Sequence, residues 1–226
     1  MFVKAKLNPG SSFNLIGYSF GGLVALEMVH RLEKEGYSGQ LILIDSSPAT
    51  MKKMAIHSDD GDANRSDALI LIDSISYLAA HVNWKEVEEE LISMKDRPSR
   101  VEYVTKMLKG LAPASDYFIS RVLLSLLFRS DAAKEYSGVP LNSIRSQVTL
   151  VRPTQGLTGD TDYQLDQYLK SPAEVHVVEG NHLSVLSSPK TASIVNEVLQ
   201  KNPTVLSKSQ SFAPSQVPDP MHKNIK

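Results

Sequence analysis

Residues 13–22 read FNLIGYSFGG, and the rest of the sequence is interpreted most simply from this point outward. The apolar run Phe13–Tyr18 is short and predicts a buried strand, while helical spacing of apolar residues begins at Ser19. Gly36 is typical of the end of that helix. A second apolar run, Gln40–Ile44, predicts another strand. Strand, helix and strand within about 33 residues form a βαβ unit, which predicts a parallel sheet with a right-handed crossover.

Gly17, Ser19 and Gly21 form a G-x-S-x-G motif between that strand and that helix, which is the context this motif requires. A serine on so sharp a turn has a strained backbone, and we expect glycine on both sides because a Cβ would collide with the neighbouring strand and helix. Gly22 adds further room. We expect Ser19 to be a nucleophile and the backbone N–H of Phe20 to face a developing oxyanion. The alternative is a tight turn without chemistry.

A nucleophilic serine needs a base and an acid. Of the six histidines, His182 fits best, because it follows the strand predicted at Glu174–Val178 in a loop at the strand's carboxyl end. The acid candidates are Asp45, and Asp160 or Asp162 in the loop after the strand predicted at residues 147–151. All three satisfy the chain order Ser, Asp, His. We prefer Asp45, because it leaves a strand directly and a rigid element holds it.

Strand signals are absent between residues 50 and about 138, where charged, helix-forming segments dominate. We therefore predict a helical insertion within one α/β domain that spans residues 1–202, with a closing helix near its end. The tail, residues 203–226, is rich in Ser, Pro and Lys and is predicted to be disordered. The helices predicted in the insertion cover residues 67–81, 84–94, 99–109 and 115–133.

One segment of the insertion, Tyr117–Phe128, has nine apolar residues out of twelve. Burial between two layers explains such a segment, and so does a groove for an alkyl chain on part of its surface. A long acyl chain gains ~0.8 kcal/mol per buried CH₂ in such a groove. The candidates for contact with the chain are Leu123, Leu126 and Leu127.

Composition excludes several classes of function. With 24 Lys+Arg against 25 Asp+Glu, no net field steers nucleic acid or an anionic membrane to the chain. The absence of cysteine excludes disulfides, thiolate metal sites and a cysteine nucleophile. No apolar run has the length of a signal peptide or of a membrane span. We expect a soluble cytoplasmic protein that needs no metal and no cofactor of its own.

Three segments in this order around a helical insertion carry a family resemblance: residues 17–22 (GYSFGG), 43–48 (LIDSSP) and 179–182 (EGNH). Together they resemble the thioesterase domain of animal-type, insect-like fatty acid synthase, in the type I thioesterase branch of the α/β-hydrolases. The resemblance covers roughly residues 11–201. It implies hydrolysis of a long-chain acyl thioester from the phosphopantetheine arm of an acyl carrier protein. It also implies Asp45 as the acid, because in that family the acid follows the strand after the nucleophile strand.

The sequence departs from that family before Phe13, where the family has several further strands and helices. We expect the chain to lack these N-terminal strands, together with the loop that carries a second oxyanion donor. Loss of one such donor costs ~10²–10³ in kcat in a well-studied case. Two other functions are therefore kept as alternatives: a general carboxylesterase or lipase with the same residues, and a non-catalytic hydrolase-fold remnant that binds acyl groups or a partner.

Overall fold

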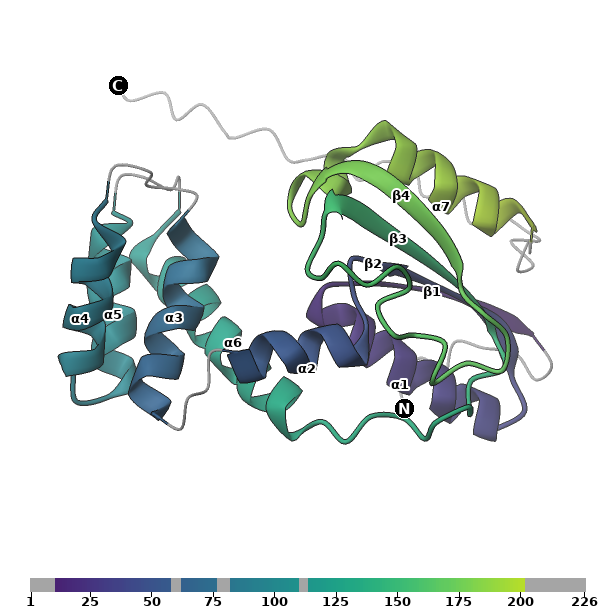
Figure 1. Cartoon of the computed structure of the whole chain (residues 1–226), viewed down its shortest axis with the longest axis horizontal. Helices are drawn as coiled ribbons and strands as arrows, with labels where there is room; N and C mark the ends of the chain where they lie inside the picture. Colours follow the sequence, from purple (N-terminus) through teal and green to yellow (C-terminus); the bar gives the residue numbers. More distant parts are fainter. Residues whose placement is uncertain (1–10, 58–61, 77–81, 110–113, 202–226) are drawn as a thin grey trace, which may run out of the picture.

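The computed structural model describes residues 11–57, 62–76, 82–109 and 114–201, and shows an α/β fold (Figure 1). Its sheet has four strands in the order β1-β2-β3-β4, and each neighbouring pair is parallel. The strands predicted from the sequence are all present with slightly longer ends, and the tail predicted to be disordered lies outside the described residues. The strands are β1 (Ser12–Tyr18), β2 (Ser38–Ile44), β3 (Gln147–Gln155) and β4 (Glu174–Asn181).

Helices cover the two faces of this sheet. On one face, α1 (Phe20–Lys34) buries Leu26 and Val29 in a cluster with side chains of β2 and β3. On the other face, α7 (Pro189–Lys201) buries Ile194 and Val198 against a second cluster from β2, β3 and β4. Figure 1 shows the sheet between these two helices. Burial on both faces explains why the central strands are apolar almost throughout, as parallel strands usually are.

A block of helices lies between β2 and β3, where the sequence predicts a helical insertion. Three of its helices stand together away from the sheet, and α6 runs from them back to the α/β body (Figure 1). The first helix was not predicted, although Pro48 at its first position is a typical helix start. The helices are α2 (Pro48–His57), α3 (Ala63–Ile75), α4 (Trp84–Ser93), α5 (Arg97–Met107) and α6 (Asp116–Glu135).

The insertion has an apolar core of its own, tied together by a charge network. Arg97 donates to Asp67 and to Asp131, each at 2.7 Å, and so links α5 to α3 and α6. The nearly buried Arg100 lies 3.7 Å from Asp67 and donates to the carbonyl of Leu91 at 2.9 Å. Because two cations share the buried Asp67, this carboxylate holds the packing of α3 against α5.

Replacement of Asp67 tests this role. In Asp67→Ala, Arg100 stays 2% exposed without its carboxylate, so we expect the free energy of unfolding in urea to fall by about 3 kcal/mol. Asp131→Ala is the matched control, because the Asp131 side chain is 42% exposed and its ion pair with Arg97 is screened by water. We expect the control to cost about 1 kcal/mol or less. Equal costs for the two variants would contradict this interpretation.

Candidate active site

Ser19 stands on the sharp turn between β1 and α1. Its backbone has φ 52° and ψ −131°, a strained conformation for a residue with a Cβ. The Ser19 N–H donates to the carbonyl of Ile44 at 3.1 Å, and the Ser46 hydroxyl donates to the carbonyl of Ser19 at 2.6 Å. These two bonds tie the turn to the end of β2. The strain predicted for a nucleophile elbow is thus present at Ser19.

Close packing explains two of the glycines around this turn. A Cβ on Gly17 would lie 2.6 Å from the Cα of Gly22, and a Cβ on Gly22 would lie 2.2 Å from the Ser46 hydroxyl oxygen. Gly21 is different, because a Cβ there would meet nothing within 4 Å. The prediction of a collision at Gly21 is therefore wrong. Gly21 is already the second residue of α1, and its Cβ position faces open space.

The structure brings Ser19, His182 and Asp45 into one hydrogen-bonded chain. His182 Nε2 lies 3.0 Å from Ser19 Oγ, and His182 Nδ1 lies 2.7 Å from Asp45 Oδ2. The three residues follow the ends of β1, β4 and β2, at the carboxyl edge of the sheet, where ligands of α/β folds usually bind. In this arrangement the imidazole can take a proton from the serine hydroxyl while the carboxylate stabilises the resulting imidazolium.

Asp45 is fully buried, and its second carboxylate oxygen has partners of its own. Asp45 Oδ1 accepts a hydrogen bond of 2.5 Å from the Tyr163 hydroxyl and a long one of 3.5 Å from the Leu157 N–H. Burial, and then the bond to Asp45, raise the pKa of the Tyr163 phenol well above its usual value. Tyr163 therefore remains a donor at alkaline pH and leaves Oδ2 of Asp45 for His182.

The other two acid candidates lie in the same loop as Tyr163 but do not bond to His182. The carboxylate of Asp160 accepts from the Gln164 side chain at 3.0 Å. The carboxylate of Asp162 accepts from the Gln164 N–H, also at 3.0 Å, so both acids serve turns within their own loop. The loop contributes Tyr163 to the site instead of an acid.

Tyr18 holds His182 from a second side. Its ring stacks on the imidazole of His182, with centroids 4.7 Å apart and planes at 24°, and its hydroxyl donates to the His182 carbonyl at 2.8 Å. Neither Tyr18 nor Tyr163 was predicted from the sequence to belong to the site. Tyr18 lies inside the G-x-S-x-G motif, which is a usable signal, whereas nothing in the sequence connects Tyr163 with Asp45.

The N–H of Phe20 opens helix α1. Backbone N–H groups in the first turn of a helix have no partner within the helix. The Ser19 carbonyl accepts a hydrogen bond of 2.9 Å from the Gly22 N–H. In the described part of the chain no residue accepts a hydrogen bond from the Phe20 N–H. A backbone donor without an acceptor among the described residues thus lies at the positive end of α1, directly after Ser19 in the chain.

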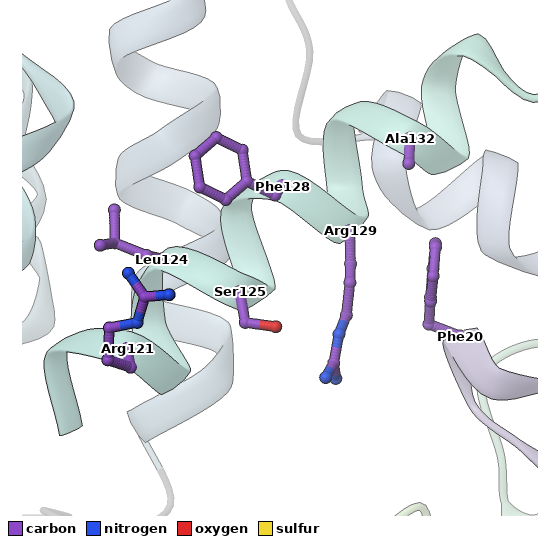
Figure 2. A pocket seen from close by; sticks show the side chains of 7 residues that line it. All are labelled: Phe20, Arg121, Leu124, Ser125, Phe128, Arg129 and Ala132. Atoms are coloured by element: carbon purple, nitrogen blue, oxygen red, sulfur yellow. The ribbon is translucent and has the colours of Figure 1, made fainter. Parts of the chain in front are cut away.

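A cavity of about 400 Å³, here called the α6 groove, opens between Phe20 and α6 (Figure 2). Leu123, Leu126 and Leu127, the residues predicted to contact an acyl chain, are not among the residues that line this groove. Leu123 and Leu127 are 2% and 0% exposed in the core of the insertion, and Leu126 packs against that core. A helix turns about 100° per residue, so these positions lie opposite the groove-facing stripe. The stripe consists of Arg121, Leu124, Ser125, Phe128, Arg129 and Ala132.

Comparison with known proteins assigns the family. The Thioesterase domain profile matches residues 3–201, so the chain belongs to the thioesterase domain family. Malpinin synthetase of Mortierella alpina is 38% identical over 65 residues, which are 29% of this chain and 1% of that protein.

Solved structures share the fold. A four-domain nonribosomal peptide synthetase, holo-AB3403 bound to AMP and glycine, superposes with a TM-score of 0.65 at 19% identity, over 89% of this chain and 15% of that one. The type II thioesterase BorB from the borrelidin cluster gives 0.51 at 14% identity, over 90% and 67% of the two chains. Human thioesterase 2 gives 0.50 at 12% identity, over 88% and 76%. The chain thus spans only a small part of the synthetases it matches.

The described residues contain no group of three His, Asp or Glu side chains arranged to hold a metal ion. None of the helices among them is long and apolar enough to cross a membrane.

The two glycines of the turn make a matched test. In Gly22→Ala the new Cβ meets the Ser46 side chain, so we expect a loss of about 1–3 kcal/mol in the free energy of unfolding and slower labelling of Ser19 by a fluorophosphonate. In Gly21→Ala the Cβ enters open space and helix propensity improves, so stability should stay equal or rise slightly. If both variants are destabilised alike, packing does not explain Gly22.

Tyr163→Phe tests the support of Asp45. It removes a donor to a buried carboxylate, so we expect the rate of fluorophosphonate labelling at Ser19 to fall about tenfold. Tyr37→Phe removes a hydroxyl from another tyrosine of the same core cluster and should leave the rate unchanged. Labelling at the wild-type rate in Tyr163→Phe would show that Asp45 is held without this bond.

Proposed function

We propose that the chain is a serine hydrolase that cleaves acyl thioesters, with Ser19 as nucleophile, His182 as base and then acid, and Asp45 as the group that orients His182. The observation that carries this proposal is the hydrogen-bonded chain from Ser19 Oγ through His182 to Asp45, at 3.0 and 2.7 Å, within a thioesterase-family fold. A turn without chemistry does not require a buried carboxylate aligned behind a histidine.

The reaction proceeds in two halves. Ser19 Oγ attacks the thioester carbonyl while His182 Nε2 takes the hydroxyl proton, and the oxygen that becomes negative faces the Phe20 N–H. The C–S bond then breaks, and the imidazolium gives its proton to the departing thiolate. In the second half His182 takes a proton from water, the resulting hydroxide attacks the acyl-serine, and Ser19 regains its proton as the acid leaves. Asp45 stays ionised throughout.

The substrate that we propose is a long-chain fatty acyl group on the phosphopantetheine arm of an acyl carrier protein, so that hydrolysis ends chain growth and frees the fatty acid. The resemblance of residues 17–22, 43–48 and 179–182 to fatty acid synthase thioesterases supports it. The likeness to thioesterases and synthetases such as BorB and AB3403 supports a carrier-borne substrate in general. The enzyme would need no cofactor of its own, because the arm arrives with the substrate.

A peptidyl thioester is the second candidate. Two observations favour it: 38% identity with malpinin synthetase over 65 residues, and a TM-score of 0.65 with a nonribosomal peptide synthetase. The chemistry at Ser19 would be the same for both acyl groups. Only the walls of the binding site would distinguish a peptide from an alkyl chain.

Labelling and turnover test the proposal together. We expect a fluorophosphonate to add once to the wild-type chain, by intact mass, and not to Ser19→Ala. Dodecanoyl-pantetheine should be hydrolysed with a kcat/KM at least tenfold above that for p-nitrophenyl acetate and for a dipeptidyl-pantetheine. His182→Ala should lower kcat by about 10⁴ or more, because the base is lost. His176→Ala is the matched control, since His176 lies on β4 and bonds to Glu174.

Each other outcome selects an alternative. Preference for the oxygen ester would favour a carboxylesterase, and preference for the peptidyl thioester would favour the second candidate. A folded chain with a cooperative unfolding transition but no adduct would contradict catalysis and favour a binding remnant.

A further inference from the structure

Tyr163 reaches Asp45 from a turn with an uncommon backbone. Tyr163 and the next residue, Gln164, have φ 55° and φ 57°, in the left-handed region that residues with a Cβ rarely adopt. The turn lies in the segment that follows β3, residues 156–165, here called the Tyr163 loop. Such strain persists only where the surroundings impose it, so other contacts must hold Tyr163 while its hydroxyl donates to Asp45.

Arg152, a residue of β3, contacts the Tyr163 loop at two points. Its Nη1 donates to the carbonyl of Asp160 at 2.7 Å, and its guanidinium carbon lies 5.9 Å from the centre of the Tyr163 ring. The first contact fixes the chain three residues before Tyr163. The second places a cation over the ring, within the range of a cation–π interaction. The side chain of Arg152 therefore holds both the backbone and the ring that lead to Asp45.

No ion pair explains an arginine at this position of β3. Arg152 is partly buried, and among the described residues no carboxylate pairs with it. Its Nε is buried and has no hydrogen-bond partner in the same part of the chain. A buried donor without an acceptor costs free energy, so the two contacts with the Tyr163 loop are what the structure gains from this side chain.

Ser47 supports the loop at a different place. Its buried hydroxyl donates to the backbone carbonyl of Tyr163 at 2.7 Å. This bond fixes the peptide group of Tyr163, whereas the guanidinium of Arg152 lies over its ring. The direction of the Tyr163 hydroxyl therefore depends more on Arg152 than on Ser47.

We propose that Arg152 is a positioning residue for the reaction at Ser19, because it fixes Tyr163 where the phenol hydroxyl meets Asp45. This inference rests on the proposed function and deepens it, because it extends the hydrogen-bonded chain behind the nucleophile by one more side chain. Within the described residues, no hydrogen bond or ion pair joins Arg152 to Ser19, Asp45 or His182. An effect of Arg152 on the reaction therefore passes through Tyr163.

A double-mutant cycle on the rate of fluorophosphonate labelling at Ser19 tests the inference. In Arg152→Met, which has a flexible side chain without charge, we expect the rate to fall about fivefold, because Tyr163 is no longer held toward Asp45. In the Tyr163→Phe background the same substitution should change the rate less than about twofold, because the bond that Arg152 positions is already absent. Arg152→Lys keeps a cation near the ring and should restore part of the rate.

Turnover of dodecanoyl-pantetheine adds a second readout. We expect Arg152→Met to lower kcat and to leave KM nearly unchanged, because the residue acts on the groups behind Ser19 and not on the bound substrate. A general loss of folded protein would lower the apparent kcat of every variant in proportion to the unfolded fraction. Urea unfolding of each variant measures that fraction.

Arg145→Met is the matched control. Arg145 donates to the carbonyl of Glu33 at 2.9 Å and precedes β3, whereas the Tyr163 loop leaves the carboxyl end of that strand. The substitution removes the same charge and the same kind of bond to a carbonyl. We expect the labelling rate of Arg145→Met to stay within about twofold of the wild-type rate, because Arg145 has no contact with the groups behind Ser19.

Hydrogen exchange of the Tyr163 loop, read by mass spectrometry, tests the position of the loop without any reaction. The amide of Leu157 donates to Asp45 and that of Gln164 donates to Asp162. We expect loop amides to exchange faster in Arg152→Met than in the wild-type chain and in Arg145→Met, because the loop opens more often when Arg152 no longer holds it.

Two results would overturn the inference: labelling of a folded Arg152→Met variant within twofold of the wild-type rate, or the same fivefold loss with and without the Tyr163 hydroxyl. Failure of the proposed function looks different, because the wild-type chain would then form no adduct at all. In that case, faster exchange of the loop in Arg152→Met still supports the contact of Arg152 with Tyr163, and unchanged exchange contradicts it.

Discussion

The buried carboxylate of Asp45 is the interaction on which the site depends. A fully buried charge is very costly unless it is paired and hydrogen-bonded, and Asp45 finds its partners in two distant segments. Tyr163 supplies a hydroxyl at 2.5 Å and His182 an imidazole nitrogen at 2.7 Å. Tyr163 follows β3 and His182 follows β4, so the hydrogen bonds of Asp45 connect the segments that leave the carboxyl ends of β2, β3 and β4.

The backbone at this edge is held in uncommon conformations. Ser19 has φ 52° and Asp45 has φ 44°, both in the left-handed half of the map. Such strain persists only where the surroundings determine it, and here the Ser46 hydroxyl and the carbonyls of Ile44 and Val151 hold both residues in place. A nucleophile fixed in this way needs little reorganisation during the reaction that we propose, which is the advantage of a rigid site.

The residues that line the α6 groove could not be predicted from the composition of α6. The apolar run in Tyr117–Phe128 predicts a helix correctly, but not which face of that helix is free. Leu123 and Leu127 are buried in the core that α6 forms with α3 and α5. The opposite face of α6, which carries Arg121 and Arg129, therefore lines the groove. The choice of face depends on how the insertion folds on itself and lies over Phe20.

By itself, the sequence determined the order of strands and helices, the sharp turn at Ser19, and the positions of Asp45 and His182 at strand ends, because hydrophobic period and turn residues are local properties. Only the tertiary structure decided that Asp45 lies beside His182 while Asp160 bonds within its own loop. It also decided that Tyr163 supports Asp45. The contacts of Asp45 with His182 and with Tyr163 each join residues more than a hundred positions apart in the sequence. The packing of the sheet and its crossovers brings such residues together, and no local sequence pattern encodes that packing.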